Sequence, residues 1–302
     1  MDIFFSVDVE ITDHRLSYSE NLDTNLLLPY VKLAEYLAQN EIKSTFYLSI
    51  APKALGISWD DYQRCLKQII RINQSVYSDY IRLQPHLHCL NLPFEYAKQS
   101  DFFLDYEPKQ QVEMLKFSKH FMEDLGVEVD SFRPGGFKNS PTYYESLEEA
   151  GFTYSSTMRK DLKPAMDLVN KKVDKQHGVF KEGGITEYPV TSVFLNSVKG
   201  NEDTINLSPD FFEYEAIETY LKQMEFMVIN FHSFSLCHGR PVRELFQSRR
   251  KETLKHLIRE FILKKISKPF DVELMTNTIY ERQFYNWTEK LLKPNNCKWI
   301  GE

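Results

Sequence analysis

The sequence predicts an α/β protein whose strands form one closed or nearly closed β/α barrel. Short apolar runs typical of buried strands alternate with segments of helical periodicity, which is the pattern of successive βα units and a parallel sheet. The chain has 302 residues, of which 42% are hydrophobic and 26% are charged, and these values suit a globular barrel of one domain. An open, doubly wound sheet is the competing arrangement.

Eight short segments are predicted to be strands. They are bounded by helical patterns or turn residues, so we expect most of them to be parallel neighbours in one sheet. They cover residues 3–7, 43–49, 80–88, 127–133, 152–155, 185–190, 226–231 and 270–274.

Helices are predicted between these strands, where apolar residues recur on one face. The clearest is a stripe over residues 114–125, which Gly126 can end in the left-handed conformation. Residues 158–183 are lysine-rich and weakly patterned, and we predict an excursion or a loop there. A C-terminal helical extension of about residues 276–302 completes a single barrel domain, 1–302. The other predicted helices are at about 30–37, 60–72, 141–150, 211–223 and 242–263.

Charge and missing motifs exclude several classes of function. The net charge is −6 and no basic patch stands out, so we expect no binding to nucleic acid. No apolar window approaches the roughly 18 residues of a membrane span, and no signal peptide is visible. The four cysteines form no CxxC pair and fit reduced thiols, so we expect a cytoplasmic protein. The GxGxxG, P-loop, GxSxG and HExxH patterns are absent.

His86 and His88 are the most informative residues of the chain. They lie one residue apart at the end of a predicted strand, so period-two alternation points both imidazoles to the same face. Two imidazoles on one face near a strand end are half of a metal site. A hydrogen-bonded histidine pair without a metal is the alternative.

Two carboxylates end the first predicted strand in the same way. Asp8 and Glu10 share a face if the strand stays extended. The carboxyl ends of parallel strands are where α/β barrels keep their active sites. A strand-end acid that only caps the following loop is the alternative.

Arg133 and His232 also follow predicted strands. A Pro-Gly-Gly turn comes directly after Arg133 and can aim its guanidinium inward, where it would grip a carboxylate through two hydrogen bonds. His232 ends a buried run at the barrel mouth. A simple turn and a structural histidine are the respective alternatives.

Taken together, these segments resemble the polysaccharide deacetylase family (NodB-homology, carbohydrate esterase family four). The order matches the family: the Asp8 segment, the histidine pair, the Arg133 segment and the final His232. The segment Lys-Ser-Thr-Phe-Tyr at 43–47 resembles the family's second strand, and the resemblance covers most of the chain. The HLH and HSFSL sequences are most similar to a WbmS-like subgroup associated with bacterial surface-polysaccharide genes.

The resemblance implies a distorted (β/α)7-8 barrel and the metal-dependent hydrolysis of an N-acyl or O-acyl group on a sugar. The implied cofactor is a divalent metal, with Zn first and Mn, Fe, Co or Ni as alternatives. The implied partner is an acylated amino sugar or oligosaccharide that is nucleotide-linked or lipid-linked. The implied roles are general base for Asp8, metal ligand for Glu10, His86 and His88, orientation of Asp8 for Arg133, and general acid for His232.

Three features depart from the family's pattern. Asp-Val-Glu replaces an Asp-Asp pair, HLH replaces the wider HxxxH, and Ser155 stands where relatives often carry Asp. The first two leave open whether Glu10 or Asp8 is the carboxylate ligand. Two other functions stay open as well: a catalytically inactive carbohydrate-binding relative, and a related amidohydrolase that acts on a non-sugar amide.

Overall fold

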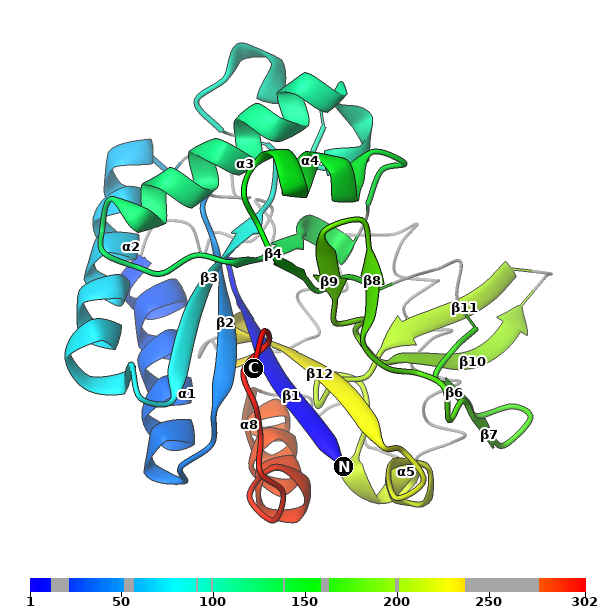
Figure 1. Ribbon diagram of the computed structural model, residues 1–302. Coiled ribbons are helices and arrows are strands. Elements are labelled where there is room, and N and C mark those ends of the chain that lie inside the picture. The colour runs from blue at the N-terminus through cyan, green and yellow to red at the C-terminus, as the bar shows by residue number, and fades with distance from the viewer. Residues whose placement is uncertain are drawn as a thin grey trace.

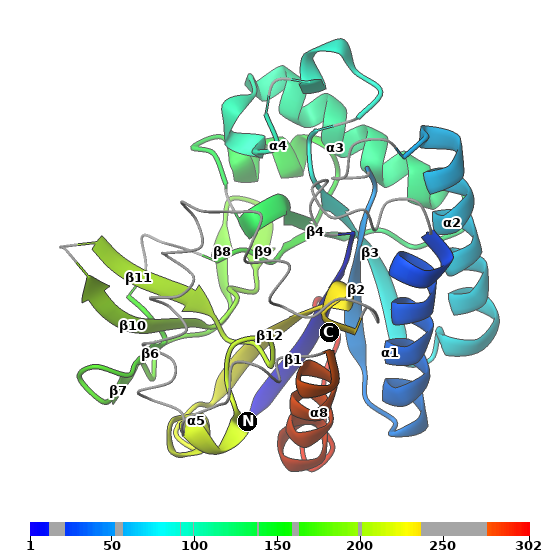
Figure 2. The same cartoon turned by 180° about the vertical axis from the view of Figure 1, so that it is seen from behind.

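The computed structural model describes residues 1–11, 22–51, 57–90, 92–98, 100–137, 139–158, 163–198, 201–236 and 277–302. Within these residues, seven parallel strands form a curved sheet in the order β12-β1-β2-β3-β4-β5-β9, and β8 pairs antiparallel with β9 (Figures 1 and 2). The strands are β1 (Asp2–Val9), β2 (Ser44–Ser49), β3 (Ile81–Leu87), β4 (Ser131–Pro134), β5 (Tyr154–Ser155), β8 (Phe180–Glu182), β9 (Ile185–Glu187) and β12 (Phe226–His232).

Backbone hydrogen bonds beyond β9 bring the sheet back to β12. The N–H of Val190 donates to the carbonyl of Thr157 at 2.8 Å, and the N–H of Thr191 donates to the carbonyl of Val228 at 3.0 Å. The segment 188–191 therefore bonds to the chain beyond β5 on one side and to β12 on the other. The predicted α/β fold and its distorted, nearly closed barrel are confirmed, and the open doubly wound sheet is not what forms.

Helices cover the outer face of the sheet, as predicted (Figure 1). In the longest of the described helices, Glu107 and Gln110 form a capping box around Pro108, and Gly126 has φ +78 just beyond the end. The helices are α1 (Leu28–Gln39), α2 (Trp59–Ile72), α3 (Pro108–Glu123), α4 (Tyr143–Glu149), α5 (Tyr214–Leu221) and α8 (Asn277–Trp287). Short π-helical turns are η1 (Asp23–Leu27), η2 (Asn73–Tyr77) and η8 (Thr288–Leu292), and 3-10 turns are η3 (Glu95–Lys98), η4 (Phe103–Asp105), η5 (Gly135–Phe137) and η6 (Ser233–Leu236).

A second sheet lies beside the barrel, and the sequence did not predict it (Figure 1). Its order is β11-β10-β6-β7, and it is formed by β6 (Met166–Asp167), β7 (Lys172–Val173), β10 (Ser192–Val198) and β11 (Asn201–Asn206). The segment 158–183, predicted as an excursion or a loop, contains the short strands β6, β7 and β8. The two-residue strands β6 and β7 are too short to show a period of two.

Strand β4 is shorter than the predicted run 127–133. Before Ser131, the side chain of Gln84 takes the place of a strand partner: its Nε2 donates to the carbonyl of Glu128 at 3.1 Å, and its Oε1 accepts the N–H of Asp130 at 3.1 Å. The predicted helix at 242–263 and the predicted strand at 270–274 lie outside the described residues.

The C-terminal segment is helical from α8 through η8, up to Leu292, and α8 packs on the outer face of β1 and β12. Phe284 is fully buried, with its ring 5.1 Å from that of Phe231 and 6.0 Å from that of Phe5. Trp287 is also fully buried, and its indole N–H donates to the carbonyl of Phe212 at 2.9 Å. The division of the chain into one domain stays a prediction.

The barrel interior is apolar at one end and polar at the other. Phe4, Tyr47 and Val228 form an inner cluster with Ile300 from the C-terminal tail. The backbone N–H of Ile300 donates to Thr45 Oγ1 at 3.0 Å, which ties the tail to the second strand. Polar residues occupy the carboxyl ends of the strands, where the site is found. Within the part of the chain that the structure describes, no helix has the length and apolar character needed to cross a membrane.

We predict that Phe284→Ala destabilises the protein by about 3–5 kcal/mol, because it opens a cavity between α8 and the sheet. Urea unfolding of the purified variant measures this change. Val76→Ala is the control, since Val76 is 64% exposed and its loss should change the free energy of unfolding by less than about 0.5 kcal/mol. Equal stability of the two variants would contradict the packing of α8.

Candidate functional site

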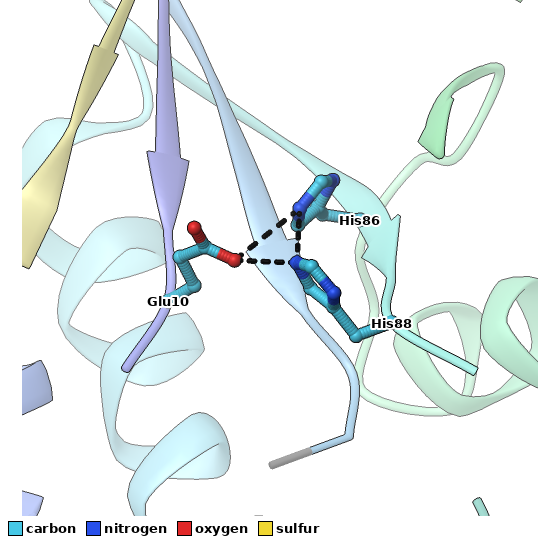
Figure 3. A group of neighbouring side chains, drawn as sticks. All are labelled: Glu10, His86 and His88. Atoms are coloured by element: carbon cyan, nitrogen blue, oxygen red, sulfur yellow. Dashed lines mark hydrogen bonds and ion pairs between the residues drawn. The ribbon is translucent and has the colours of Figure 1, made fainter. Parts of the chain in front are cut away.

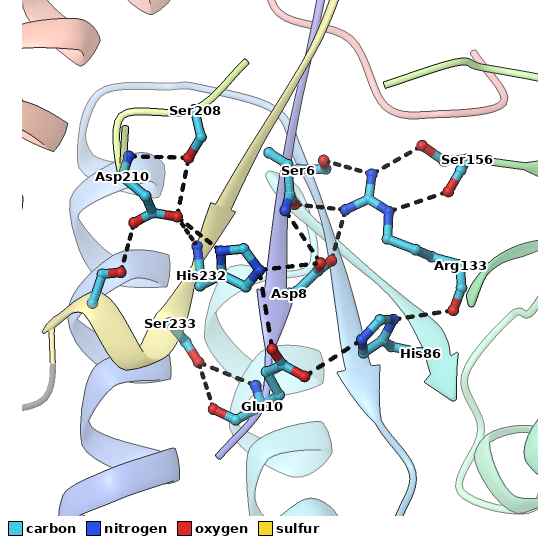
Figure 4. Close-up of polar contacts among 12 residues, drawn as sticks. Ser6, Asp8, Glu10, His86, Arg133, Ser156, Ser208, Asp210, His232 and Ser233 are labelled. Atoms are coloured by element: carbon cyan, nitrogen blue, oxygen red, sulfur yellow. Dashed lines mark hydrogen bonds and ion pairs between the residues drawn. The ribbon is translucent and has the colours of Figure 1, made fainter. Parts of the chain in front are cut away.

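The polar residues singled out in the sequence meet at the carboxyl ends of neighbouring strands. Strand β1 pairs in register with β12 at the level of Asp8 and His232, and β3 pairs with β4 at the level of His86 and Arg133. Side chains two positions apart share a face, so each strand sends a row of them into the barrel. The structure brings together all six predicted site residues (Figures 3 and 4): Asp8, Glu10, His86, His88, Arg133 and His232.

Arg133 is fully buried, and each of its two terminal nitrogens donates two hydrogen bonds. Nη1 donates to Asp8 Oδ1 at 2.6 Å and to Asn230 Oδ1 at 2.7 Å, while Nη2 donates to Ser6 Oγ at 2.8 Å and to Ser156 Oγ at 2.9 Å. A buried charge without such partners is strongly destabilising. Arg133 therefore links β1, β12 and the chain after β5 into one rigid polar layer.

Asp8 is held in its ionised form by this layer. Burial raises the pKa of its carboxyl, but the charge of Arg133 beside it, with the electrostatic effects of His86 and His232, outweighs burial and lowers the pKa below its ordinary value. Asn230 Nδ2 also donates to Asp8 Oδ2 at 3.2 Å. Asp8 is thus an ionised, fixed carboxylate at neutral pH.

Glu10, His86 and His88 form a compact, buried group of metal-type donors (Figure 3). Glu10 Oε2 lies 2.6 Å from His88 Nε2 and 3.5 Å from His86 Nε2, and the two nitrogens are 3.2 Å apart. Ligands about 2.1 Å from a tetrahedral zinc ion lie about 3.4 Å from one another. Two of the three separations, 3.2 and 3.5 Å, are close to this value, and the 2.6 Å separation between Glu10 Oε2 and His88 Nε2 would widen for the three donors to share one divalent cation.

Hydrogen bonds behind each imidazole decide which nitrogen faces this group. The backbone carbonyl of Arg133 can only accept, so His86 Nδ1 donates to it at 3.0 Å. His88 Nδ1 donates to Asp101 Oδ2 at 2.9 Å. With Nδ1 as the donor of each ring, Nε2 is the nitrogen of each imidazole that faces Glu10 and that would bind a cation together with the carboxylate.

The geometry favours Glu10 over Asp8 as the carboxylate ligand. Among the described residues, the group of donors close enough to share an ion contains Glu10 and the two histidines. Asp8 is engaged instead by Arg133 and Asn230. The longer glutamate side chain reaches the cation site, and the aspartate stays free of it.

His232 faces both carboxylates from β12 (Figure 4). Its Nε2 lies 3.9 Å from Asp8 Oδ2 and 4.0 Å from Glu10 Oε1, and its Nδ1 donates to Asp210 Oδ2 at 2.8 Å. Burial alone would lower the pKa of His232, but the hydrogen bond and charge of Asp210, with the charges of Asp8 and Glu10, raise it to about 9. The imidazole therefore carries its proton at neutral pH.

Several residues that support the site are not among those predicted from the sequence. Asn230 and Ser6 each lie two positions before a predicted site residue, so alternation along the strand could have found them. Asp210 and Asp101 lie in irregular segments, and neither has a local sequence signal that distinguishes it from a surface carboxylate.

Comparison with known proteins gives similar structures only. No family model matches the chain, and no curated protein matches it. The chain is similar in structure to a 4-alpha-glucanotransferase from Thermococcus litoralis, with 15% identity and a TM-score of 0.49. That match covers 94% of this chain, which spans 38% of the glucanotransferase.

Two further similar structures are described as polysaccharide deacetylases. One, from Mycobacterium smegmatis, has 13% identity and a TM-score of 0.48, with 99% of this chain and 93% of that chain covered. The other, WbmS from Bordetella bronchiseptica, is described as involved in O-antigen biosynthesis. It has 11% identity and a TM-score of 0.44, with 93% of this chain and 88% of that chain covered.

Gly135 makes room for the His88 ring. A methyl group at this position would lie 2.7 Å from His88 Nδ1 and 2.9 Å from the carbonyl oxygen of Leu87. Real side chains do not approach so closely, so any larger residue must displace the imidazole or the end of β3. The Pro-Gly-Gly turn after Arg133 therefore serves the histidine pair as well as the arginine.

We predict that Gly135→Ala weakens Zn²⁺ binding by about 10-fold or more, because the displaced imidazole no longer points its Nε2 at the cation. Competition with a chromophoric chelator measures the affinity. Gly178→Ala is the control, since its nearest atom would be 4.0 Å from the new methyl group. Wild-type affinity in Gly135→Ala would show that His88 does not need this space.

Proposed function

We propose that this protein is a metal-dependent hydrolase that removes an N-acyl, or less readily an O-acyl, group from a sugar in bacterial surface polysaccharide biosynthesis. The observation that carries this proposal is that three kinds of group meet at the carboxyl ends of the strands. They are the ionised Asp8, the protonated His232, and Glu10, His86 and His88, which we call the trio. The resemblance of these motifs, in the same order, to polysaccharide deacetylases supports the sugar substrate.

The trio suits the first requirement of acyl hydrolysis, which is to activate the water and the acyl carbonyl. A divalent cation held by Glu10, His86 and His88, with zinc as the first choice, would acidify a water molecule and polarise the acyl carbonyl. His86 and His88 are held by hydrogen bonds on their far sides, so they need little rearrangement to bind the cation.

Asp8 and His232 suit the two proton transfers. Asp8 is ionised, and Oδ2 is its atom nearest to His232, so Asp8 would accept the proton of the attacking water. His232 holds its proton at neutral pH and would donate it from Nε2 to the leaving group. An amine leaves only when it is protonated, whereas an alkoxide depends less on an acid. A protonated general acid in this position therefore suits an amide better than an ester.

The test begins with the metal. Protein reconstituted with Zn²⁺, Mn²⁺, Fe²⁺, Co²⁺ or Ni²⁺ is measured for bound metal and then for acetate or formate release from a panel of N-acylated amino sugars. We expect one bound ion per chain and acyl release that a chelator abolishes. Protein that binds none of these metals would refute the proposal.

We predict that Asp8→Asn lowers the rate of acyl release by about 10²–10⁴-fold, because the general base is lost. The bound metal should remain, since Asp8 is not in the trio, and circular dichroism checks that the variant is folded. Asp2→Asn is the matched control, an exposed aspartate at the start of the same strand that should keep full activity. Wild-type activity in Asp8→Asn would show that Asp8 is not the general base.

The two alternatives give different results in the same assays. A binding relative would hold metal and sugar while releasing no acyl group from any compound. An amidohydrolase with another substrate would cleave a formamide or a ureide and leave the acylated sugars intact. The attachment of the sugar to a nucleotide or a lipid and the cytoplasmic location stay predictions.

A further inference from the structure

A carboxylate outside the trio is bonded directly to one of its imidazoles. Asp101 Oδ2 lies 2.9 Å from His88 Nδ1, on the side of the ring opposite to Glu10. The His88 side chain is 4% exposed, and that of Asp101 is 21% exposed. His88 is therefore placed between two carboxylates, one at each ring nitrogen.

The two imidazoles of the trio differ in the group that accepts their Nδ1 hydrogen bond. His86 donates its Nδ1 proton to a neutral backbone carbonyl, whereas His88 donates its Nδ1 proton to a carboxylate. A carboxylate behind a metal-bound imidazole fixes the ring and makes its other nitrogen a stronger electron donor. His88 is thus the better donor of the pair, and Asp101 is the cause.

The loop that carries Asp101 is held by hydrogen bonds among its own residues. The backbone N–H of Ser100 donates to the hydroxyl of Tyr106 at 3.0 Å, and that hydroxyl donates to the carbonyl of Ser100. The N–H of Phe102 donates to Ser100 Oγ at 3.1 Å, while Phe103 and Tyr106 are buried. These contacts hold residues 100–106 as a closed turn. Asp101 lies in this turn and accepts the hydrogen bond from His88.

We propose that Asp101 is a positioning residue for the metal and that the turn 100–106 is coupled to metal occupancy. This inference rests on the metal site of the proposed function. Coupling free energy is reciprocal. If the turn strengthens Zn²⁺ binding through Asp101, then Zn²⁺ binding must stabilise the turn by the same amount.

Two readouts that do not depend on activity test this proposal. Asp101→Asn keeps the shape of the side chain but removes its charge, and we expect its Zn²⁺ affinity to fall by about 10–100-fold. Asp101→Glu keeps the charge and should lie between that variant and the wild type. Asp79→Asn is the matched control, an exposed aspartate just before the opposite end of β3, and should bind Zn²⁺ as the wild type does.

The second readout is amide hydrogen exchange. Zn²⁺ should slow exchange at residues 100–106 in the wild type and have little effect there in Asp101→Asn. Equal Zn²⁺ affinity in the wild type and Asp101→Asn would overturn the inference alone, and so would a turn that Zn²⁺ leaves unprotected. A wild type that binds no metal would overturn the inference and the proposed function together.

Discussion

The buried ion pair between Arg133 and Asp8 is the interaction on which the site depends. Arg133 is fully buried, and its terminal nitrogens bond to residues of β1 and β12 and to Ser156 beyond β5. Removing one partner from such a pair costs about 3–5 kcal/mol, because the other charge is left buried. The guanidinium can reach all these partners only if the barrel is nearly closed, so the fold and the polar layer depend on each other.

The polar layer around Arg133 also reduces the repulsion between two carboxylates at the end of β1. Asp8 and Glu10 point to the same side, and two neighbouring carboxylates repel one another. Arg133 neutralises Asp8, and a cation held with His86 and His88 would neutralise Glu10. The two acids are thereby assigned to separate tasks, one as a base and one as a ligand. The HLH spacing and the longer glutamate suit each other, because both histidines and Glu10 Oε2 meet within 3.5 Å.

Period-two strands and helical stripes are the features that could be predicted from the sequence. The strand-end residues from Asp8 to His232 were found because parallel strands end at one edge of a barrel. Asp101 and Asp210 were not found, because irregular loops bring them to the histidines and no spacing reveals that. In the second sheet, β6 and β7 were missed because they have only two residues each, and β11 was missed because its sequence, NEDTIN, has a single apolar residue. The order of the motifs was enough to locate the site, whereas the loop contacts that tune it depend on the three-dimensional fold.

The most direct test of this account is a crystal structure of the zinc-loaded protein measured at the zinc absorption edge. We expect one anomalous peak at the carboxyl end of β3, about 2.0–2.2 Å from Glu10 Oε2 and from the Nε2 atoms of His86 and His88, with Asp8 bonded to Arg133. A peak coordinated by Asp8 in place of Glu10, or density without any peak between the two imidazoles, would contradict it.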